Sequence, residues 1–444
     1  MALNFYSILL RIFAPLIWLW LGWRARRAGG EWQIFASERF GVYAQPWDGD
    51  PPVWVHAVSL GETRAAQSLI AGLIARGDRV LLTHMTATGR AEGARLFAAD
   101  IAAGRLRQEW LPYDFAGATK KFFAHYRPRL GLLIEREVWP NLIAQGRLAG
   151  VLTMLVSARF SANALKHVRQ IDRLFGSLMK SAYAGLSLTL AQTQEDAGRL
   201  FEAGAINVNV SGNLKFDAQL PVVAVEAGRA WRVKLNRPII AIASTREGED
   251  AMFVPALTSR QDAFGSGVLF LLIPRHPQRF DEAAALLEQA GIDFVRWSVI
   301  RHDVQAKETL DRIQVVLCDT LGEMPFFYAA SDVAIVGGSF APLGGQNLIE
   351  ACAVGTPVIV GPFTRNFKDA VQGAVQAGAA IQLTESDLVD PAVGAVSTAL
   401  EWLNDEHTLE QRSHAAKNWV SQHTGAASRM LQQINDFQDE RAIP

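Results

Sequence analysis

Short apolar runs alternate along this chain with longer segments in which apolar residues recur at helical spacing. In the first half the runs lie at 53–57, 79–83, 130–134 and 152–156, and helical patterns follow the first two at 62–76 and 90–98. Apolar runs of this length, bounded by turn residues, predict strands that are buried on both faces. Their alternation with helices predicts an α/β protein with a doubly wound parallel sheet.

The same pattern starts again in the second half. The segment 215–238 contains a proline and an Ala/Val-rich stretch, which predicts a linker with a connecting helix, and further apolar runs lie at 239–243, 268–273, 315–317, 333–336 and 358–360. Two such sheets in tandem predict two Rossmann-like domains that face each other across a cleft. Ligands of these sheets bind beyond the carboxyl ends of the strands, so the residues that follow each run are the candidate site residues.

Residues 2–23 are almost entirely apolar or aromatic, and the basic flank 24–27 follows them. The stretch is long enough to cross a bilayer as a helix. Trp18, Trp20 and Trp23 resemble interfacial anchors, and the basic flank predicts a cytoplasmic position for the rest of the chain. Arg11 would be costly at the bilayer centre, so a helix lying in the membrane interface stays open. So does an ordinary buried helix.

We therefore expect a membrane anchor helix at 1–28, a first domain at 29–217, a linker at 218–238 and a second domain at 239–444. The last helical segments, at 395–438, look amphipathic and could pack on either domain.

Composition adds three constraints. Half of the 444 residues are hydrophobic and a fifth are charged, which excludes a disordered chain. The 43 basic and 44 acidic residues nearly cancel, which gives no reason to expect nucleic-acid binding. Two cysteines, Cys318 and Cys352, are too few for a disulfide framework, and both read as small buried core residues.

The first polar segment after a predicted strand is 58–63, which contains Ser59, Gly61 and Glu62. A carboxylate in the first turn of a helix is stabilised as an anion by the helix dipole, which favours a group that can accept a proton. Ser59 and Glu62 also form a capping box, because their spacing is Ser-x-x-Glu. The pattern alone favours capping over catalysis.

Charged residues also follow the strands predicted at 130–134 and 152–156. Glu135, Arg136 and Glu137 follow the first, and Arg159 follows the second. The two carboxylates could hold sugar hydroxyls, or they could form a structural ion pair with the arginine.

In the second half, Arg275 and His276 stand between two prolines after the strand at 268–273. An arginine at a strand end is well suited to bind a phosphate by its charge and its bidentate geometry. Glycines at 337–338 and 344–345 precede a helix that begins near Asn347 and Glu350, where a phosphate could approach the backbone. This is neither a G-x-G-x-x-G nor a Walker loop. Asn347 and Glu350 are also a capping box by themselves.

No metal site is expected. Asp48 and Asp50 have the D-x-D spacing of many metal-dependent glycosyltransferases, but they lie in a turn before the first strand.

Nine segments, in this order, resemble the 3-deoxy-D-manno-octulosonate (Kdo) transferases over nearly the whole chain. They are 37–41, 58–62, 85–89, 137–141, 157–161, 212–217, 274–277, 321–324 and 344–350. Each segment is weak alone, but nine in register are specific. Arg136 and Gln346 depart from the family, which often has Thr and His there.

The resemblance implies a GT-B fold and an inverting, metal-independent transfer of Kdo from CMP-Kdo to a lipid A precursor at the cytoplasmic face of the inner membrane. It implies no cofactor. It makes Glu62 the catalytic base. The implied donor contacts are Arg275, His276, Leu321, Gly322, Glu323, Asn347, Leu348, Ile349 and Glu350, with Lys215 nearby. The residues expected on the acceptor side or in the cleft are Ser59, Gly61, Glu38, Arg39, Thr86, Glu137 and Arg159.

Two other functions remain open from the sequence. One is a GT-B transferase that moves a UDP-sugar to another lipid acceptor, and the other is an inactive scaffold that binds lipid or nucleotide. Competition of CMP against UDP, and release of CMP on turnover, would separate them.

Overall fold

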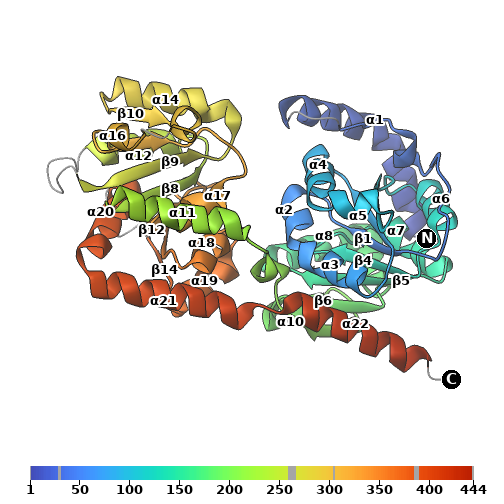
Figure 1. Cartoon of the computed structure of the whole chain (residues 1–444). Coiled ribbons are helices and arrows are strands. Elements are labelled where there is room, and N and C mark those ends of the chain that lie inside the picture. Colours follow the sequence, from blue (N-terminus) through green and yellow to red (C-terminus); the bar gives the residue numbers. More distant parts are fainter. Residues whose placement is uncertain (1, 29–31, 259–266, 304–305, 385–389, 443–444) are drawn as a thin grey trace. The chain divides into compact units, whose positions relative to one another are not determined.

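The computed structural model describes residues 2–28, 32–258, 267–303, 306–384 and 390–442 (Figure 1). The chain forms two compact units, and each has its own sheet. Unit 1 comprises Met1–Gln219 and His423–Pro444, and unit 2 comprises Leu220–Gln422.

The sheet of unit 1 has seven parallel strands in the order β3-β2-β1-β4-β5-β6-β7. These are β1 (Val53–His56), β2 (Val80–His84), β3 (Leu106–Trp110), β4 (Leu130–Ile134), β5 (Leu152–Ala158), β6 (Leu188–Ala191) and β7 (Val208–Val210). Its helices are α1 (Ala2–Ala28), η1 (Ser37–Phe40), α2 (Leu60–Ala65), α3 (Gln67–Ala75), α4 (Ala87–Leu96), α5 (Ala98–Ala102), α6 (Ala116–Tyr126), α7 (Pro140–Leu148), α8 (Ala162–Phe175), α9 (Leu178–Tyr183), α10 (Gln194–Glu202), η2 (Leu214–Asp217) and α22 (Ala426–Ala442).

Unit 2 repeats this plan with strand order β10-β11-β9-β8-β12-β13-β14, again all parallel. Its strands are β8 (Ile239–Thr245), β9 (Leu269–Pro274), β10 (Phe294–Arg296), β11 (Val315–Leu317), β12 (Val333–Val336), β13 (Val358–Val360) and β14 (Ala380–Gln382). Its helices are α11 (Val222–Leu235), α12 (Glu249–Thr258), η4 (Pro277–Arg279), α14 (Phe280–Gln289), α15 (Trp297–Ile300), α16 (Ala306–Leu310), α17 (Met324–Ala330), α18 (Ile349–Val354), α19 (Lys368–Gln376), α20 (Pro391–Asn404) and α21 (Glu406–His423).

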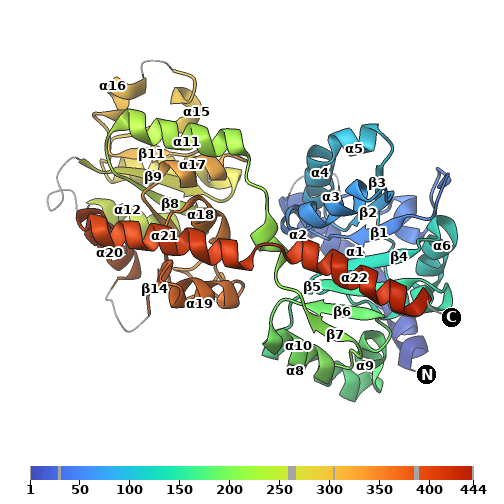
Figure 2. The same ribbon diagram turned by 60° about the horizontal axis from the view of Figure 1, so that its bottom comes forward.

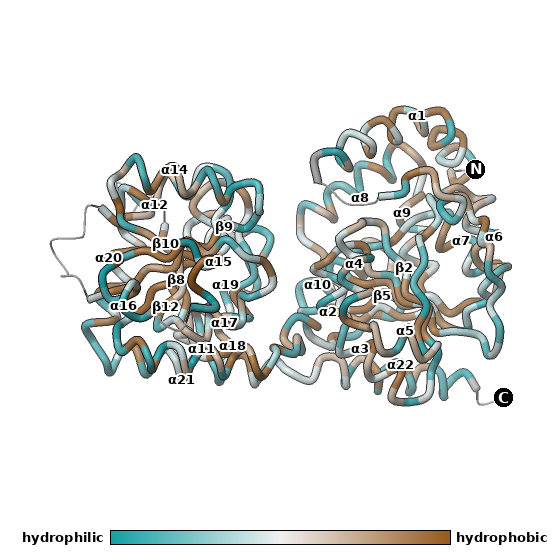
Figure 3. The backbone as a smooth tube through the Cα atoms, turned by 45° about the horizontal axis from the view of Figure 1, so that its top comes forward, coloured by the Kyte–Doolittle hydropathy of each residue, from teal (hydrophilic) through white to brown (hydrophobic). Residues whose placement is uncertain are grey.

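Both sheets are covered on two faces, as the continuous apolar runs predict. In β1, Val53 and Val55 belong to one core cluster of unit 1, and Trp54 belongs to the cluster on the other face. The strands form the most hydrophobic part of each unit in Figure 3. The predicted pair of Rossmann-like domains is confirmed, and Cys318 and Cys352 are buried free cysteines as expected.

The C-terminal helix differs from the expected division of the chain, which assigned 239–444 to the second domain. The helix α22 packs on α3 within unit 1 (Figures 1 and 2). Its Met430 and Ile434 are fully buried in the same cluster as Val53. Asp217 accepts hydrogen bonds from the backbone N–H groups of Gly425 and Ala427, at 2.6 and 2.5 Å, and so caps this helix.

The expected linker at 218–238 is also different, because most of it is the helix α11 of unit 2. This helix packs closely on α17, where a Cβ atom at Gly228 would lie 2.3 Å from the carbonyl oxygen of Phe326. The chain therefore passes between the units near Gln219 and Leu220.

The N-terminal helix α1 is long and apolar enough to cross a membrane, and most of its apolar surface is exposed. One side of it docks on unit 1. The Tyr6 hydroxyl donates to Asp114 (3.0 Å), Ser7 bonds Asn141 (3.0 Å), and the Trp18 ring packs edge-on against Phe115. Figure 1 shows that α1 changes direction along its length, and Pro15 lies within it. A proline inside a helix removes a backbone hydrogen bond and favours such a bend.

Candidate active site

The predicted polar residues of unit 1 meet at the point where the strand order of its sheet reverses. The adjacent strands β1 and β4 are connected to β2 and β5 on opposite sides of the sheet. Glu62 follows β1, and Glu135 and Glu137 follow β4. In doubly wound sheets this switch point is where ligands bind. The sequence therefore placed these carboxylates at the right edge and at the right strands.

Glu62 lies in the first turn of α2 and takes part in both hydrogen bonds that cap this helix, one through its backbone N–H and one through its carboxylate. The Ser59 hydroxyl accepts from the backbone N–H of Glu62 (3.4 Å), and the Glu62 carboxylate accepts from the backbone N–H of Val58 (2.6 Å). The capping interpretation of this pattern is therefore correct as local geometry. It uses one carboxylate oxygen, because the bond to Val58 involves Oε2.

The ionisation of Glu62 differs from the expectation that the helix dipole keeps it anionic. Burial, with the neighbouring carboxylates of Glu137 and Glu135, raises the pKa of Glu62 to about 8. The Val58 N–H bond and the Lys215 ammonium act in the opposite direction and are outweighed. A carboxylate with a pKa near the working pH is a stronger base than a solvated one, and it suits general base catalysis.

The partner of Glu135 is Lys215, whose ammonium lies 2.5 Å from the carboxylate. Lys215 is held by η2, where the Ser157 hydroxyl accepts from the backbone N–H of Leu214 (3.2 Å). Glu135 and Ser157 both have positive φ angles, 61° and 49°. Non-glycine residues in this strained region cluster at functional sites, since the surrounding structure must hold them there. Lys215 was expected beside the donor, and within unit 1 it lies in the carboxylate cluster.

Glu137 connects this cluster to an aromatic residue. The Trp139 indole donates to the Glu137 carboxylate (3.0 Å), and the Trp139 ring packs edge-on against buried His56. Burial raises the pKa of Glu137 as well. Glu62, Glu135 and Glu137 thus form one carboxylate cluster, with Lys215 as its cation.

Other residues expected on the acceptor side have structural contacts. Arg39 is buried, stacks on the Trp110 ring at 4.0 Å and donates to the backbone oxygens of Trp32 and Met85 (3.0 and 3.1 Å). Thr86 caps α4 and donates to the Val58 carbonyl (2.8 Å), which supports the turn before Glu62.

Glu38 lies beside Arg39 in η1, and Arg159 directly follows β5. Glu38 follows Ser37 in η1, and the Arg159 backbone N–H donates to the Glu135 carbonyl (3.3 Å).

In unit 2 the switch point lies between β8 and β12, and the strand ends beside it carry the predicted cations. Arg275 and His276 follow β9, and the Arg275 backbone N–H bonds the Thr245 carbonyl at the end of β8 (2.9 Å). Burial, with the nearby Arg275 and Arg246 guanidinium groups, lowers the pKa of His276. Ser244, in β8, has a φ angle of 58°, so this strand end is strained like that of β5.

The backbone N–H groups of the glycine-rich segment after β12 have a different partner from the one predicted. We expected its backbone to receive a phosphate, but the fully buried Glu249 carboxylate accepts from the N–H groups of Gly338 (2.5 Å), Phe340 (2.9 Å) and Ala341 (3.2 Å). These three N–H groups therefore already donate to protein and are not available to a phosphate. Glu249 also accepts from Arg246 N–H (2.8 Å), so one side chain fixes two strand ends.

Glu249 was not among the residues predicted from the sequence. The signal was present, because the polar segment 246–249 follows the apolar run at 239–243 in the same way that 58–62 follows 53–57.

The other residues expected to contact the sugar-nucleotide donor lie at the same edge of unit 2. Asn347 accepts from Ile349 N–H and donates to the Glu350 carboxylate, both at 3.1 Å. The predicted capping box is not formed, because Leu348 occupies the N-cap position of α18 and no side chain caps it. Leu321 and Gly322 are exposed beyond β11, and Glu323 precedes α17. The four strands that carry these segments, β11, β9, β8 and β12, are neighbours in the sheet.

Metal ligands are not gathered in the described part of the chain, where no group of three or more His, Cys, Asp or Glu side chains is arranged to hold an ion. Asp48 and Asp50 lie before β1, at the edge of the sheet opposite to Glu62. The Asp50 carbonyl accepts from the Trp47 indole (2.9 Å), which fits the predicted turn.

Solved structures with this fold include a glycosyltransferase from Rickettsia africae, with a TM-score of 0.56, 12% identity, and coverage of 88% of this chain and 99% of that one. A UDP-N-acetylglucosamine 2-epimerase has a TM-score of 0.54 at 16% identity, with coverage of 86% and 95%. These likenesses concern the fold alone. Together with the two parallel sheets, they define a protein of the GT-B class.

Sequence relatives identify the family within that class. A 3-deoxy-D-manno-octulosonic acid transferase of Bordetella pertussis is 55% identical over 97% of this chain and 98% of its own length. That of Haemophilus influenzae is 29% identical over 98% of both chains. The family model described as 3-Deoxy-D-manno-octulosonic-acid transferase (kdotransferase) matches residues 36–218. The chain belongs to the Kdo transferase family, and it is a glycosyltransferase of lipopolysaccharide biosynthesis.

Proposed function

We propose that this enzyme transfers Kdo from CMP-Kdo to a lipid A precursor, with inversion and without a metal, and that Glu62 is its catalytic base. The observation that carries this proposal is the Glu62 carboxylate at the switch point of unit 1, with a pKa of about 8. Inactive scaffolds have no need of a buried carboxylate that is costly to ionise, whereas perturbed pKa values are typical of active sites.

The reaction is a single displacement. Glu62 accepts the proton of an acceptor hydroxyl, the hydroxyl oxygen bonds the anomeric carbon of Kdo, and the bond from that carbon to the CMP phosphate oxygen breaks. CMP leaves with the electron pair. Oε1 of Glu62 is the atom suited to take the proton, because Oε2 is held by Val58.

Space for an acceptor exists beside Glu62. Gly61 is exposed, and a Cβ atom built there would meet no atom within 4 Å. No described atom near Gly61 requires a glycine there, and a sugar that passes over the first turn of α2 would use this space.

The donor side rests on the cations of unit 2. Arg275, Arg246 and Arg279 all lie close enough to His276 to lower its pKa. Arg246 pairs with Glu247 (3.1 Å) and Arg279 with Asp250 (2.6 Å), so Arg275 is our candidate for the phosphate. A nucleoside monophosphate leaving group carries less charge than a diphosphate. Arginine forks could neutralise it without a metal.

The test is Glu62→Gln, assayed with CMP-Kdo and a tetra-acylated lipid A precursor by mass spectrometry of the product. Loss of a general base costs about 10²–10⁴-fold in rate, and we expect kcat to fall in that range while CMP still binds. The fold should persist, because the amide oxygen can accept from Val58. Near-normal transfer by a folded Glu62→Gln protein would show that Glu62 is a cap alone.

A further inference from the structure

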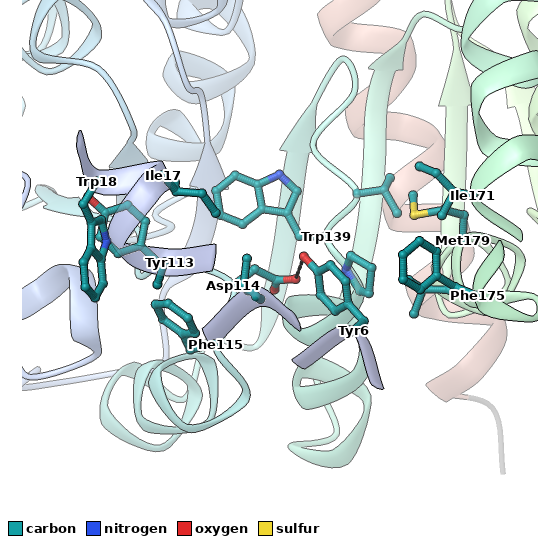
Figure 4. A pocket seen from close by; sticks show the side chains of 15 residues that line it. Tyr6, Ile17, Trp18, Tyr113, Asp114, Phe115, Trp139, Ile171, Phe175 and Met179 are labelled. Carbon is teal, nitrogen blue, oxygen red and sulfur yellow. Dashed lines mark hydrogen bonds between the residues drawn. The ribbon is translucent and has the colours of Figure 1, made fainter. Parts of the chain in front are cut away.

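An apolar cavity of about 450 Å³ lies between the inner side of α1 and unit 1 (Figure 4). Leu10, Ala14 and Ile17 line it from α1, and Ile171 and Met179 line it from the region of α8 and α9. Its size is within the range of about 300–1,000 Å³ that is usual for ligand pockets. None of the sequence patterns had indicated it.

Three polar side chains of the cavity wall, Tyr6, Tyr113 and Trp139, are already bonded to protein. Figure 4 shows the Tyr6 hydroxyl directed at Asp114, at 3.0 Å. The Tyr113 hydroxyl donates to the Ile34 carbonyl (2.9 Å), and the Trp139 indole donates to Glu137 (3.0 Å). Since burying a polar ligand without partners is costly, the wall favours a hydrocarbon occupant.

The segment from Glu137 to Pro140 joins this cavity to the carboxylate cluster. Val138, Trp139 and Pro140 line the cavity, while Glu137 lies near enough to Glu62 to raise its pKa. An occupant of the cavity therefore contacts the same short segment that carries Glu137 beside the base.

The other side of α1 is apolar as well. Ile12 and Leu19 are 63% and 71% exposed, whereas Ala14, facing the cavity, is 4% exposed. A helix that is hydrophobic on nearly all sides belongs in a core or a membrane. Apart from the exposed Arg11, the apolar residues of α1 before its basic end form one face for each. A chain leaving the bilayer can enter the cavity along apolar surface.

We propose that this cavity holds one fatty acyl chain of the lipid acceptor and thereby positions the acceptor sugar at Glu62. The inference rests on the proposed function for its acceptor. It adds that acyl chains are recognised by the protein itself, beyond anchoring the acceptor in the same membrane.

The test compares a tetra-acylated bisphosphorylated glucosamine disaccharide with its fully deacylated form, both in detergent micelles. Ile171→Trp and Met179→Trp each fill the cavity from the side of α8 and α9, and neither changes a residue of the carboxylate cluster. The matched control is Leu174→Trp, on the same helix α8, at a residue that is 77% exposed. All variants keep the exposed face of α1, so partition into micelles is the same.

We expect the native protein to prefer the acylated acceptor in kcat/KM. Each buried methylene is worth roughly a fourfold change in binding, so shorter acyl chains should lower the preference stepwise. Both filling variants should lose the preference by tenfold or more and keep native activity on the deacylated acceptor, while Leu174→Trp behaves as native. An unchanged preference in folded filling variants would overturn the proposal.

A second readout separates this inference from the proposed function. The fluorescent fatty acid 11-(dansylamino)undecanoic acid should bind the native protein and Leu174→Trp, and binding to the filling variants should be at least tenfold weaker. If neither acceptor receives Kdo from CMP-Kdo, the proposed function fails and this binding comparison still judges the cavity. Equal binding to all four proteins contradicts it.

Discussion

Glu62 caps its own helix and, in our proposal, also carries out the proton transfer. Both roles follow from one position, because a cap brings the carboxylate back over the strand end, where the sheet leaves room for a ligand. The pKa of Glu62 is raised first by burial and then by the Glu137 and Glu135 carboxylates, and the Lys215 ammonium, 2.5 Å from Glu135, does not offset these effects.

The raised pKa of Glu62 predicts the pH dependence of the enzyme. A base must be deprotonated to act, so kcat/KM should rise with pH and level off above about 8, the pKa of Glu62. Glu137→Gln removes a negative neighbour, which stabilises the ionised form of Glu62 and should move the inflection to lower pH. The measurement is the pH profile of kcat/KM for both proteins. An inflection that stays in place, or moves upward, contradicts the assignment.

Glu249 offers a second prediction at the same scale. In Glu249→Gln, one carboxylate oxygen becomes an amide nitrogen. This nitrogen faces backbone N–H groups and cannot accept their hydrogen bonds, as the carboxylate does. Leaving a buried donor without a partner costs about 1–3 kcal/mol, so we expect a lower unfolding midpoint and a higher KM for the donor. Glu288→Gln, at an exposed residue of α14, is the control and should change neither. Thermal unfolding and initial rates measure both quantities.

The sequence pattern predicted where the site residues lie, but it did not predict their contacts or their ionisation. The rule that ligands meet strand ends found Glu62, Glu137 and Arg275. It could not show that Glu249 uses the glycine-loop donors, because that depends on the distance between two loops about 90 positions apart in the chain. The raised pKa of Glu62 likewise depends on neighbours from another strand.

At the scale of elements, the strands missed by the apolar pattern are mostly the outer ones. The strands β3, β7, β10 and β14 are the edges of the two sheets, and only β6 among the missed strands is internal. Edge strands are less completely covered by the rest of the unit, so fewer of their residues have to be apolar. In β3, for example, Arg107 and Gln108 are half-buried. Central strands read clearly because both faces are covered.

The helix α22 was recognised as amphipathic, but its destination depended on Asp217 and on the space over α3. Ile434→Ala should therefore weaken unit 1 by about 2–5 kcal/mol, the usual cost of an isoleucine truncated in a core. Hydrogen exchange should quicken in β1 and β4 and stay unchanged in β8. Gln432→Ala, on the exposed side of α22, is the control. Faster exchange in β8 alone would contradict this placement of the helix.

For the whole molecule, the exposed face of α1 predicts membrane attachment. The double change Ile12→Glu and Leu19→Glu puts charge on that face and leaves the contacts of Tyr6 and Trp18 intact. Burying charge in a bilayer is costly, so we expect the variant to leave the pellet when sedimented with phospholipid vesicles. Val233→Glu, at a residue 76% exposed on α11, should sediment as native. A variant that stays with the vesicles would show that α1 is not the attachment.

The return of α22 to unit 1 also sets an order of events during synthesis. The strands of unit 1 leave the ribosome first, but Met430 and Ile434 of their core are translated after all of unit 2. Unit 2 has its whole sequence before unit 1 does. A nascent chain must therefore leave the α22 side of the unit 1 sheet uncovered until α22 has been translated, and a chain truncated before α22 has a first unit whose core is incomplete.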